Sequence, residues 1–188
     1  MDWLRNENDF YVSLEKALGE IDKKWKKYPG LIISGTHAFS TDVEAKLEAI
    51  RNAREKGIPA LLICGGMQLG LIEYARNVLG LVDANSTEIN PQTTAPIITE
   101  LSEMRVGIRP VTWRGEMSME SHWHKYALNN AYLDWLNDWE ISFTDAIAEV
   151  VQLKNHPHFL GIQWHPEYQS SKNKPHPIIK EFLLACRK

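Results

Sequence analysis

A short apolar run, Ile58-Pro59-Ala60-Leu61-Leu62-Ile63, stops abruptly at Cys64-Gly65-Gly66-Met67-Gln68. The run has the length and composition of a fully buried parallel strand. Apolar residues at helical spacing follow, and Gly80 is a typical residue to close that helix. A strand, a sharp glycine turn and a helix, with a thiol at the vertex, form a nucleophile elbow, in which the helix N-terminus stabilises a thiolate or an oxyanion. The alternative is a buried structural cysteine before a helix.

A second apolar run, Phe159-Leu160-Gly161-Ile162-Gln163-Trp164, ends in His165-Pro166-Glu167. Residues two apart on an extended chain project to the same side, so we expect His165 and Glu167 to lie together. A cysteine nucleophile needs a base, and the imidazole needs an acceptor that orients it. Open α/β sheets place such groups at the carboxyl ends of their strands. Taken singly, the two residues would be a turn histidine and a solvated glutamate; together with Cys64 they predict a catalytic triad.

These residues stand in longer motifs that resemble the triad-type (class I) glutamine amidotransferases, and among them the glutaminase domain of CTP synthases. The resemblance extends over most of the chain from about Leu31 onward. The motifs that carry it are Cys64-Gly65-Gly66-Met67-Gln68, the stretch from Glu73 to Glu88, His122-Trp123-His124-Lys125-Tyr126 with Asn129-Asn130, Gly161 to Glu167, and Pro175-His176-Pro177.

The resemblance implies a glutaminase reaction and gives a role to further residues. The Cys64 thiolate would attack the side-chain amide of glutamine, ammonia would leave, and water would resolve the thioester. The backbone N–H of Gly65 would bind the oxyanion. Gln68, Glu88, Lys125 and Tyr126 would bind the substrate, with Glu88 at the α-ammonium group; a plain loop carboxylate is the alternative for Glu88. The resemblance implies no cofactor.

The sequence departs from the family pattern at three places. Gly65 replaces a leucine, which keeps the N–H but loosens the turn. Lys125 replaces an arginine that would hold the substrate carboxylate with two parallel hydrogen bonds. The glycine-rich oxyanion loop is replaced by Ser34-Gly35-Thr36-His37-Ala38-Phe39, so the second oxyanion donor has to come from Gly35 or from an amide such as that of Thr36. His37 is interpreted as a loop residue without a chemical role.

The rest of the chain predicts an α/β fold in three layers, with an open and mostly parallel sheet between helices. Residues 31–33 and 159–164 are predicted strands, 147–153 is another, and antiparallel strands with a short helix over 130–139 are expected between 106 and 143. Helices are predicted over 9–27, 43–56 and 178–187. Compared with the family, an opening strand and helix are expected to be missing, with residues 1–4 as a stub of the second strand. An uncovered sheet edge there would favour a homo-oligomer.

Length and composition limit the kinds of partner that we expect. The 188 residues fit a single domain, and the net charge of −3 does not indicate binding to nucleic acid. We found no membrane-spanning run and no signal peptide, so a cytoplasmic location is expected. Two cysteines are too few for a disulfide scaffold, and Cys186 is expected to pack as a small hydrophobe. His122 and His124 alternate on a possible strand, but no carboxylate or cysteine completes a ligand set at a recognisable spacing, so no metal site is predicted.

Two functions are compatible with this sequence. The first is a free-standing amidohydrolase that cleaves glutamine or another γ-glutamyl amide, with the triad Cys64, His165 and Glu167. The chain contains no phosphate loop and has no room for a synthase domain, so released ammonia would need an accepting synthase subunit. The second is a catalytically impaired binding or regulatory module, which the altered oxyanion loop would favour and the intact triad argues against.

Overall fold

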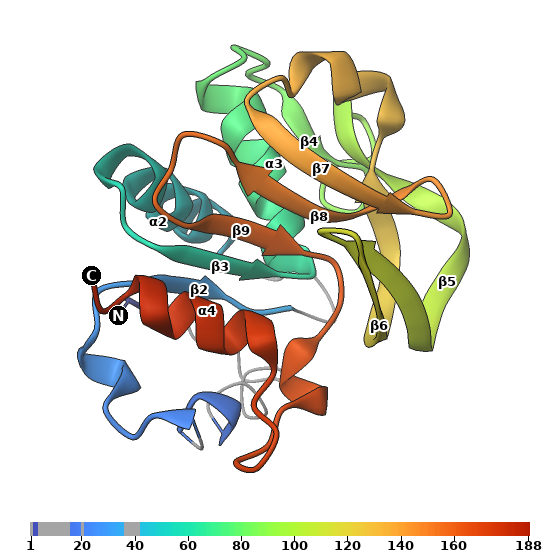
Figure 1. The fold of residues 1–188 in the computed structure, drawn as a ribbon. Helices are drawn as coiled ribbons and strands as arrows, with labels where there is room; N and C mark the ends of the chain where they lie inside the picture. Colours follow the sequence, from blue (N-terminus) through green and yellow to red (C-terminus); the bar gives the residue numbers. More distant parts are fainter. Residues whose placement is uncertain (1, 4–15, 20, 36–41) are drawn as a thin grey trace.

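The computed structural model describes residues 2–3, 16–19, 21–35 and 42–188. A six-stranded sheet runs through the molecule in the order β1-β2-β3-β9-β8-β7 (Figure 1). The strands are β1 (Asp2–Trp3), β2 (Leu31–Ile33), β3 (Ala60–Ile63), β9 (Phe159–Ile162), β8 (Ile147–Leu153) and β7 (Trp139–Thr144). The first four are parallel, whereas β8 and β7 are antiparallel to their neighbours.

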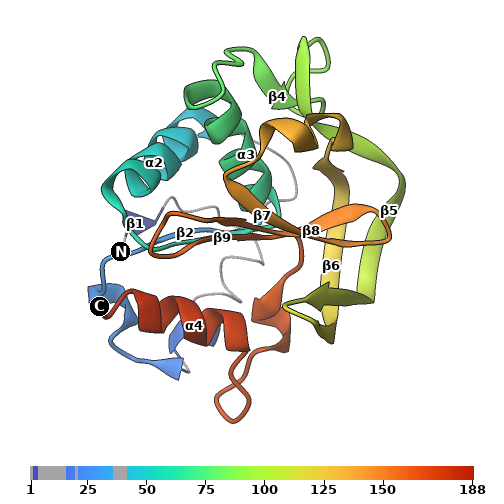
Figure 2. The ribbon, with the colours of Figure 1, turned by 45° about the horizontal axis from the view of Figure 1, so that its top comes forward.

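Helices cover both faces of this sheet. Helices α2 (Val43–Lys56) and α3 (Gly65–Asn77) lie on one face, and α4 (Pro177–Ala185) lies on the other (Figure 2). Alternate residues of the central strands supply the two cores, because successive side chains point to opposite faces. Ile33 and Leu62 pack toward α2 and α3, whereas Ile32, Leu61 and Ile63 pack in the core that contains Phe182 of α4. The predicted three-layer α/β fold is therefore confirmed.

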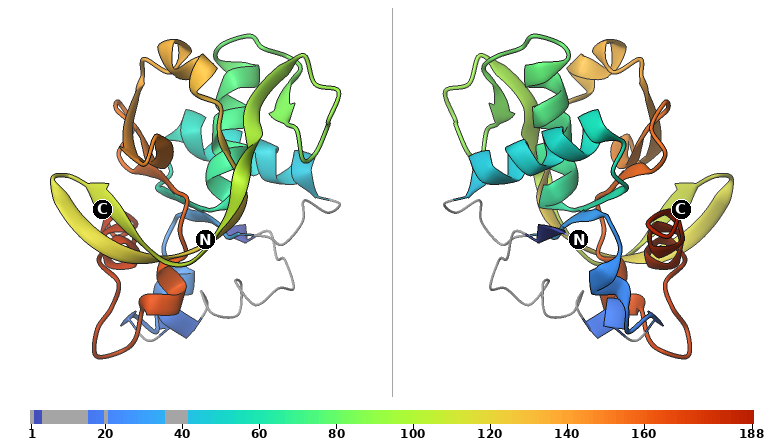
Figure 3. Two further views of the ribbon diagram at one scale, coloured as in Figure 1. Left: turned by 90° about the vertical axis from the view of Figure 1, so that its right-hand side faces the viewer. Right: turned by 90° about the vertical axis from the view of Figure 1, so that its left-hand side faces the viewer.

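A second sheet stands at one end of the first. It comprises β4 (Ala84–Ser86), β5 (Ala95–Trp113) and β6 (Glu116–Leu128) in that order. Strands β5 and β6 form a long hairpin whose turn, Arg114-Gly115, has two positive φ angles of 52° and 77°. The turn reaches α4, where the Arg114 guanidinium contacts the Glu181 carboxylate at 3.0 and 3.1 Å (Figure 3). The hairpin thus carries β6 across the carboxyl ends of the central strands.

The described structure also contains helical residues at 16–19 and 21, and the 3-10 helices η1 (Trp25–Lys27), η2 (Asn130–Trp135) and η3 (Pro166–Gln169). In the described part of the chain, no helix is long and apolar enough to span a membrane.

Several predicted elements needed correction. Of the helix predicted over 9–27, residues 9–15 and 20 lie outside the described residues, and residues 16–19 and 21 are helical as predicted. The helix ends there, because the Asp22 carboxylate accepts the Lys24 N–H at 2.8 Å in place of a helical carbonyl, and Trp25–Lys27 is the 3-10 helix η1. The helix predicted over 130–139 is the short η2, and Trp139 already belongs to β7. Strand β5 begins eleven residues before the predicted 106.

The remaining elements agree with the sequence to within a few residues. Helix α2 has the predicted bounds and ends at Gly57, which has a φ of 65°. Helix α3 ends at Asn77, and Gly80 (φ 73°) turns the chain so that the Leu81 N–H reaches the carbonyl of Ala75 at 2.9 Å. The stub at residues 2–3 pairs in parallel with β2.

Candidate active site

Cys64 occupies the turn between β3 and α3, with a φ of 53° and a ψ of −110°. A non-glycine residue in this region is strained, and such strain persists only where the surroundings fix it. The Cys64 N–H donates to the carbonyl of Ile162 at 2.7 Å, which anchors the turn to β9. Gly66 packs against the backbone of Ile33, where a Cβ would overlap the Ile33 carbonyl oxygen. The predicted nucleophile elbow is therefore present in the backbone.

His165 and Glu167 meet as predicted, though not on an extended chain. They lie where β9 runs into η3, whose 3-10 turn at Pro166 brings the Glu167 Oε1 to 2.8 Å from the His165 Nδ1. Both side chains are buried. The His165 N–H donates to the carbonyl of Ser121 on β6 at 2.8 Å, which fixes the histidine backbone. The carboxylate thus orients the imidazole.

The Cys64 and His165 side chains interact electrostatically. Burial alone would lower the pKa of His165, but the Cys64 thiolate and the Glu167 carboxylate outweigh it and raise the pKa to about 10. Gly35, just after β2, lies directly against this pair, because a Cβ there would come within 2.5 Å of the His165 Cε1 and 3.3 Å of the Cys64 Cβ. The three predicted catalytic residues and Gly35 therefore share one site.

The residues proposed for the oxyanion are only partly described. Gly65 is the first residue of α3, where backbone N–H groups have no partner within the helix. Gly35 is placed beside the catalytic pair, as described above. Thr36 and the rest of the loop to Phe39 lie outside the described residues.

The structure places the proposed substrate-binding residues in α3, in β6 and after β4. The buried Gln68 donates its Nε2 to the backbone carbonyl of Tyr126 at 2.9 Å, which ties α3 to β6. Burial, together with the charges of Glu100 and Glu88, raises the pKa of Tyr126, and burial raises the pKa of Glu88. The Lys125 Nζ lies 3.5 Å from a carboxylate oxygen of Glu100.

Comparison with known proteins identifies the family. Residues 6–185 match the family model of class-I glutamine amidotransferases. The chain belongs to this family. A CTP synthase of Pelotomaculum thermopropionicum is 36% identical over 211 residues, covering 99% of this chain and 38% of that protein. A CTP synthase of Sulfolobus acidocaldarius is 40% identical over 194 residues, covering 90% of this chain and 36% of that protein. The chain thus spans little more than a third of these relatives.

A solved structure agrees with the amidotransferase fold. The glutaminase domain of Trypanosoma brucei CTPS, solved with bound acivicin, superposes with a TM-score of 0.86 at 24% identity. The match covers 99% of this chain and 91% of that one. At this identity the likeness establishes the fold, and the resemblance to CTP synthase glutaminase domains stated from the motifs is confirmed.

Two groups beside the amidotransferase cysteine were not predicted. The backbone carbonyl of Trp123 on β6 lies 3.6 Å from the Cys64 Sγ, and the Nε2 of the buried Gln163 lies 3.8 Å from it. Gln163 precedes His165 by two residues, so the alternation of the strand predicted over 159–164 could have pointed to it. The Trp123 contact joins residues 59 apart and leaves no local signal.

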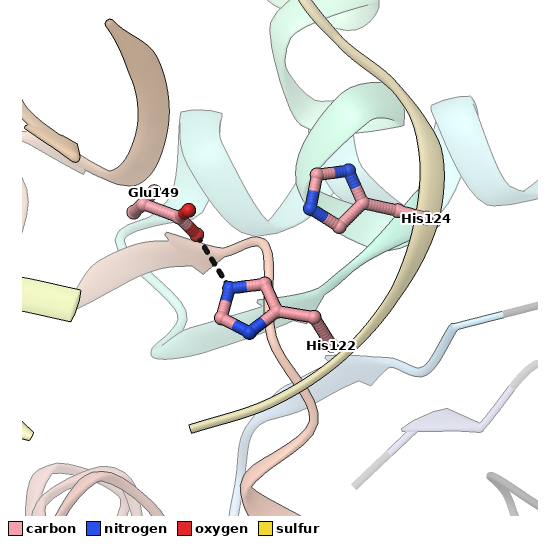
Figure 4. Close-up of side chains that lie close together, drawn as sticks. All are labelled: His122, His124 and Glu149. Carbon is pink, nitrogen blue, oxygen red and sulfur yellow. Dashed lines mark hydrogen bonds and ion pairs between the residues drawn. The ribbon is translucent and has the colours of Figure 1, made fainter. Parts of the chain in front are cut away.

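The structure also brings a carboxylate to His122 and His124, the two histidines for which the sequence spacing showed no third metal ligand. Glu149 on β8 lies beside His122 and His124 of β6, and one potential ligand atom from each lies within 4.8 Å of the others (Figure 4). All three side chains are buried. No carboxylate lies near the two histidines in the sequence, but in the folded chain Glu149 lies beside them.

Proposed function

We propose that this chain hydrolyses the side-chain amide of glutamine, or of a related γ-glutamyl compound, through a thioester on Cys64. One observation carries the proposal: a strained cysteine at the start of α3 lies beside a buried histidine and interacts with it, and a buried carboxylate orients that histidine at 2.8 Å. This is the constellation that nucleophilic acyl transfer needs, since each group supports the next.

The reaction has two halves. The Cys64 sulfur attacks the amide carbon, and the imidazolium of His165 gives its proton to the nitrogen as the C–N bond breaks and ammonia or an amine leaves. Water then attacks the thioester while His165 takes a proton from it, and the Cys64 thiolate leaves as the acid forms. Glu167 keeps the His165 Nε2 directed at the reacting atoms in both halves.

Backbone donors would stabilise the tetrahedral oxyanion. The Gly65 N–H, at the positive end of the α3 dipole, is one candidate, and the loop that begins at Gly35 supplies the other. The absence of a side chain at Gly35 supports this assignment, because it leaves the catalytic pair accessible to a backbone amide.

Recognition of the substrate rests on four residues, Gln68, Glu88, Lys125 and Tyr126. Glu88 would bind an α-ammonium group. Lys125 would hold the α-carboxylate as a point charge, and its partner Glu100 competes for it at 3.5 Å. Because every γ-glutamyl amide carries this α-carboxylate, other γ-glutamyl amides stand beside glutamine among the candidate substrates.

The fate of the ammonia is part of the proposal. The relatives are CTP synthases, of which this chain matches little more than a third. We therefore propose an ammonia-accepting synthase partner if glutamine is the substrate, and a stand-alone hydrolase if another γ-glutamyl amide is. The alternative is a binding module without turnover, which the single glycine of the 34–39 loop favours.

The deciding experiment measures ammonia or amine release from glutamine and from a panel of γ-glutamyl amides, in the wild type and in Cys64→Ala. We expect turnover that depends on Cys64, and alkylation of Cys64 by a glutamine-like chloroketone. The matched control is Cys186→Ala. Burial raises the pKa of the Cys186 thiol to about 12, so this cysteine should neither react nor matter for turnover.

Three results distinguish a glutaminase, a stand-alone hydrolase and a binding module. Turnover of glutamine supports the glutaminase, and turnover of other γ-glutamyl amides alone supports the stand-alone hydrolase. A wild-type protein without turnover of any substrate, whose Cys64 also resists alkylation, contradicts the enzyme and leaves the binding module.

A further inference from the structure

Three buried side chains from two strands converge beside the candidate active site. His122 and His124 project from the same side of β6 toward Glu149 on β8 (Figure 4). The His122 Nε2 lies 3.0 Å from the Glu149 Oε2, and the two imidazole rings lie 5.6 Å apart between centroids. The triad Cys64, His165 and Glu167 does not include any of these residues.

Both imidazoles are held with the same nitrogen facing inward. The His122 Nδ1 lies 3.0 Å from the carbonyl of Glu120, and the His124 Nδ1 lies 3.1 Å from the carbonyl of Tyr126. A carbonyl oxygen only accepts, so each Nδ1 carries the proton and each Nε2 is the inward atom. Metal-binding histidines are oriented in this way, with the distal N–H donated to a carbonyl or a carboxylate.

The inward nitrogen of His124 is a buried polar atom to which no residue in the described ranges gives a hydrogen bond. Leaving such an atom without a partner is costly. On His122, the inward nitrogen faces a carboxylate oxygen, which needs a proton or a cation between the two atoms. The His124 nitrogen therefore presents a lone pair that a bound cation would satisfy, and on His122 the cation would take the place of the proton.

Glu149 is also oriented for this role. Its Oε1 accepts from the Arg105 Nη2 at 3.1 Å, which leaves Oε2 directed at the histidines. Arg105 places a positive charge close by, which lowers the affinity for a second cation. The exposed Asp145 carboxylate, 3.9 Å from the Arg105 Nη1, offsets part of that charge.

We propose that His122, His124 and Glu149 form a site for a divalent transition metal ion, of which Zn²⁺ suits two imidazoles and one carboxylate best. Ligand atoms around tetrahedral Zn²⁺ lie roughly 3.4 Å apart. The His122–Glu149 pair is already at 3.0 Å. The ligand atom of His124 lies within 4.8 Å of the other two, so a side-chain movement of at most about 1.4 Å brings it to the tetrahedral separation. Water takes the fourth position.

The position of the site gives the ion a structural role. Trp123, between the two histidines, presents its carbonyl to the Cys64 sulfur, and Gln163, which donates its backbone N–H to the Glu149 carbonyl, presents its amide to the same sulfur. An ion that joins β6 to β8 therefore fixes both neighbours of the cysteine. The site stands whether or not the chain turns over glutamine.

The test uses the full chain with Cys64→Ala, because a thiolate beside His165 is itself a possible Zn²⁺ ligand. After removal of metals with a chelator, titration calorimetry with Zn²⁺ should show one ion per chain, and the melting temperature should rise with Zn²⁺. Adding His124→Gln should weaken binding more than about 10-fold, since loss of even an outer partner of a metal ligand costs 10- to 100-fold. His158→Gln, which alters a buried histidine outside the cluster, should leave binding unchanged.

Absence of Zn²⁺ binding to the Cys64→Ala protein, or binding that His124→Gln leaves unchanged, overturns the proposal. If the His124→Gln chain does not fold, Zn-edge X-ray absorption of the Cys64→Ala protein decides instead. A spectrum that shows two imidazole ligands on the zinc supports the site. A spectrum without imidazole ligands rules the site out.

Discussion

At the scale of single residues, the candidate active site depends on one position without a side chain. Gly35 packs against His165 and Cys64 so closely that a Cβ would approach the imidazole to 2.5 Å. A real Cβ cannot remain there, so the imidazole would have to move away from the sulfur. The close approach of Cys64 and His165 thus requires a glycine at this position.

We expect Gly35→Ala to lower kcat by about 100-fold or more, because small misplacements of a catalytic group cost about this much. The measurement is Cys64-dependent amide hydrolysis, together with the alkylation rate of Cys64. Gly30→Ala is the matched control. Its Cβ would come within 2.6 Å of the Cys186 Sγ, and Cys186 packs in the core between the sheet and α4. The control should lose stability but keep the reactivity of its folded fraction. Equal activity of Gly35→Ala and wild type would refute the packing argument.

The titration of His165 is a second prediction at this scale. The Cys64 thiolate is the largest of the effects that raise the pKa of this histidine to about 10. In Cys64→Ala the pKa of His165 should therefore fall well below 10, because only Glu167 then opposes the lowering of this pKa by burial. Imidazole resonances followed by NMR from pH 5 to 10 measure it. An imidazole that titrates at the same pH in both proteins contradicts a Cys64–His165 ion pair.

At the scale of secondary structure elements, α2 and α3 are joined by a buried ion pair. The Arg54 Nε and Nη2 each lie 2.8 Å from an oxygen of Glu73, whose side chain is fully buried. The hydrogen bond to Glu73 raises the pKa of Arg54 even though burial opposes it. This pair holds together the two helices that cover the face of the sheet behind the elbow.

We expect Arg54→Met to lower the free energy of unfolding by about 3 to 5 kcal/mol, because it leaves the Glu73 carboxylate buried without its partner. Arg51→Met on the same helix removes an exposed pair with Glu55 and should cost less than about 1 kcal/mol. Urea unfolding of both variants measures the difference. Similar losses for the two variants would show that burial does not set the strength of these pairs.

At the scale of the whole molecule, buried histidines make stability depend on pH. Burial lowers the pKa of His158, which packs against the Phe182 ring, and of His156, which lies on the same loop before β9. Below about pH 6.5 the unfolded chain binds protons that these folded histidines do not, so the free energy of unfolding falls as pH falls. The contribution is present above pH 6.5 and is lost toward the lowered pKa values.

The expected slope is at most about 1.4 kcal/mol per pH unit for each such histidine. Replacing His158 with Gln should make the slope between pH 6.5 and 5 shallower, because glutamine does not titrate. Urea unfolding at several pH values, with a chelator present throughout, measures it. A slope unchanged in His158→Gln would mean that this histidine titrates alike in the folded and unfolded chains.

Much of the fold and of the candidate triad could be predicted, because short segments of the sequence determine them. Four apolar residues before Cys64 specify a buried strand, the period of residues 43–56 specifies an amphipathic helix, and the glycines after Cys64 specify a tight turn. His165 and Glu167 are two residues apart, so their contact needs little more than the local chain. The roles of Glu88, Lys125 and Tyr126 toward a substrate stay predictions.

By itself, then, the sequence determined the layers of the fold, the elbow at Cys64 and the His165–Glu167 pair, because short-range sterics and hydrophobic periodicity decide them. Only the tertiary structure decided that Trp123 and Gln163 flank the sulfur, that Arg54 meets Glu73, and that Glu149 completes a cluster with His122 and His124. These contacts join residues 19 to 99 positions apart. They depend on strand order and register, which no local pattern encodes.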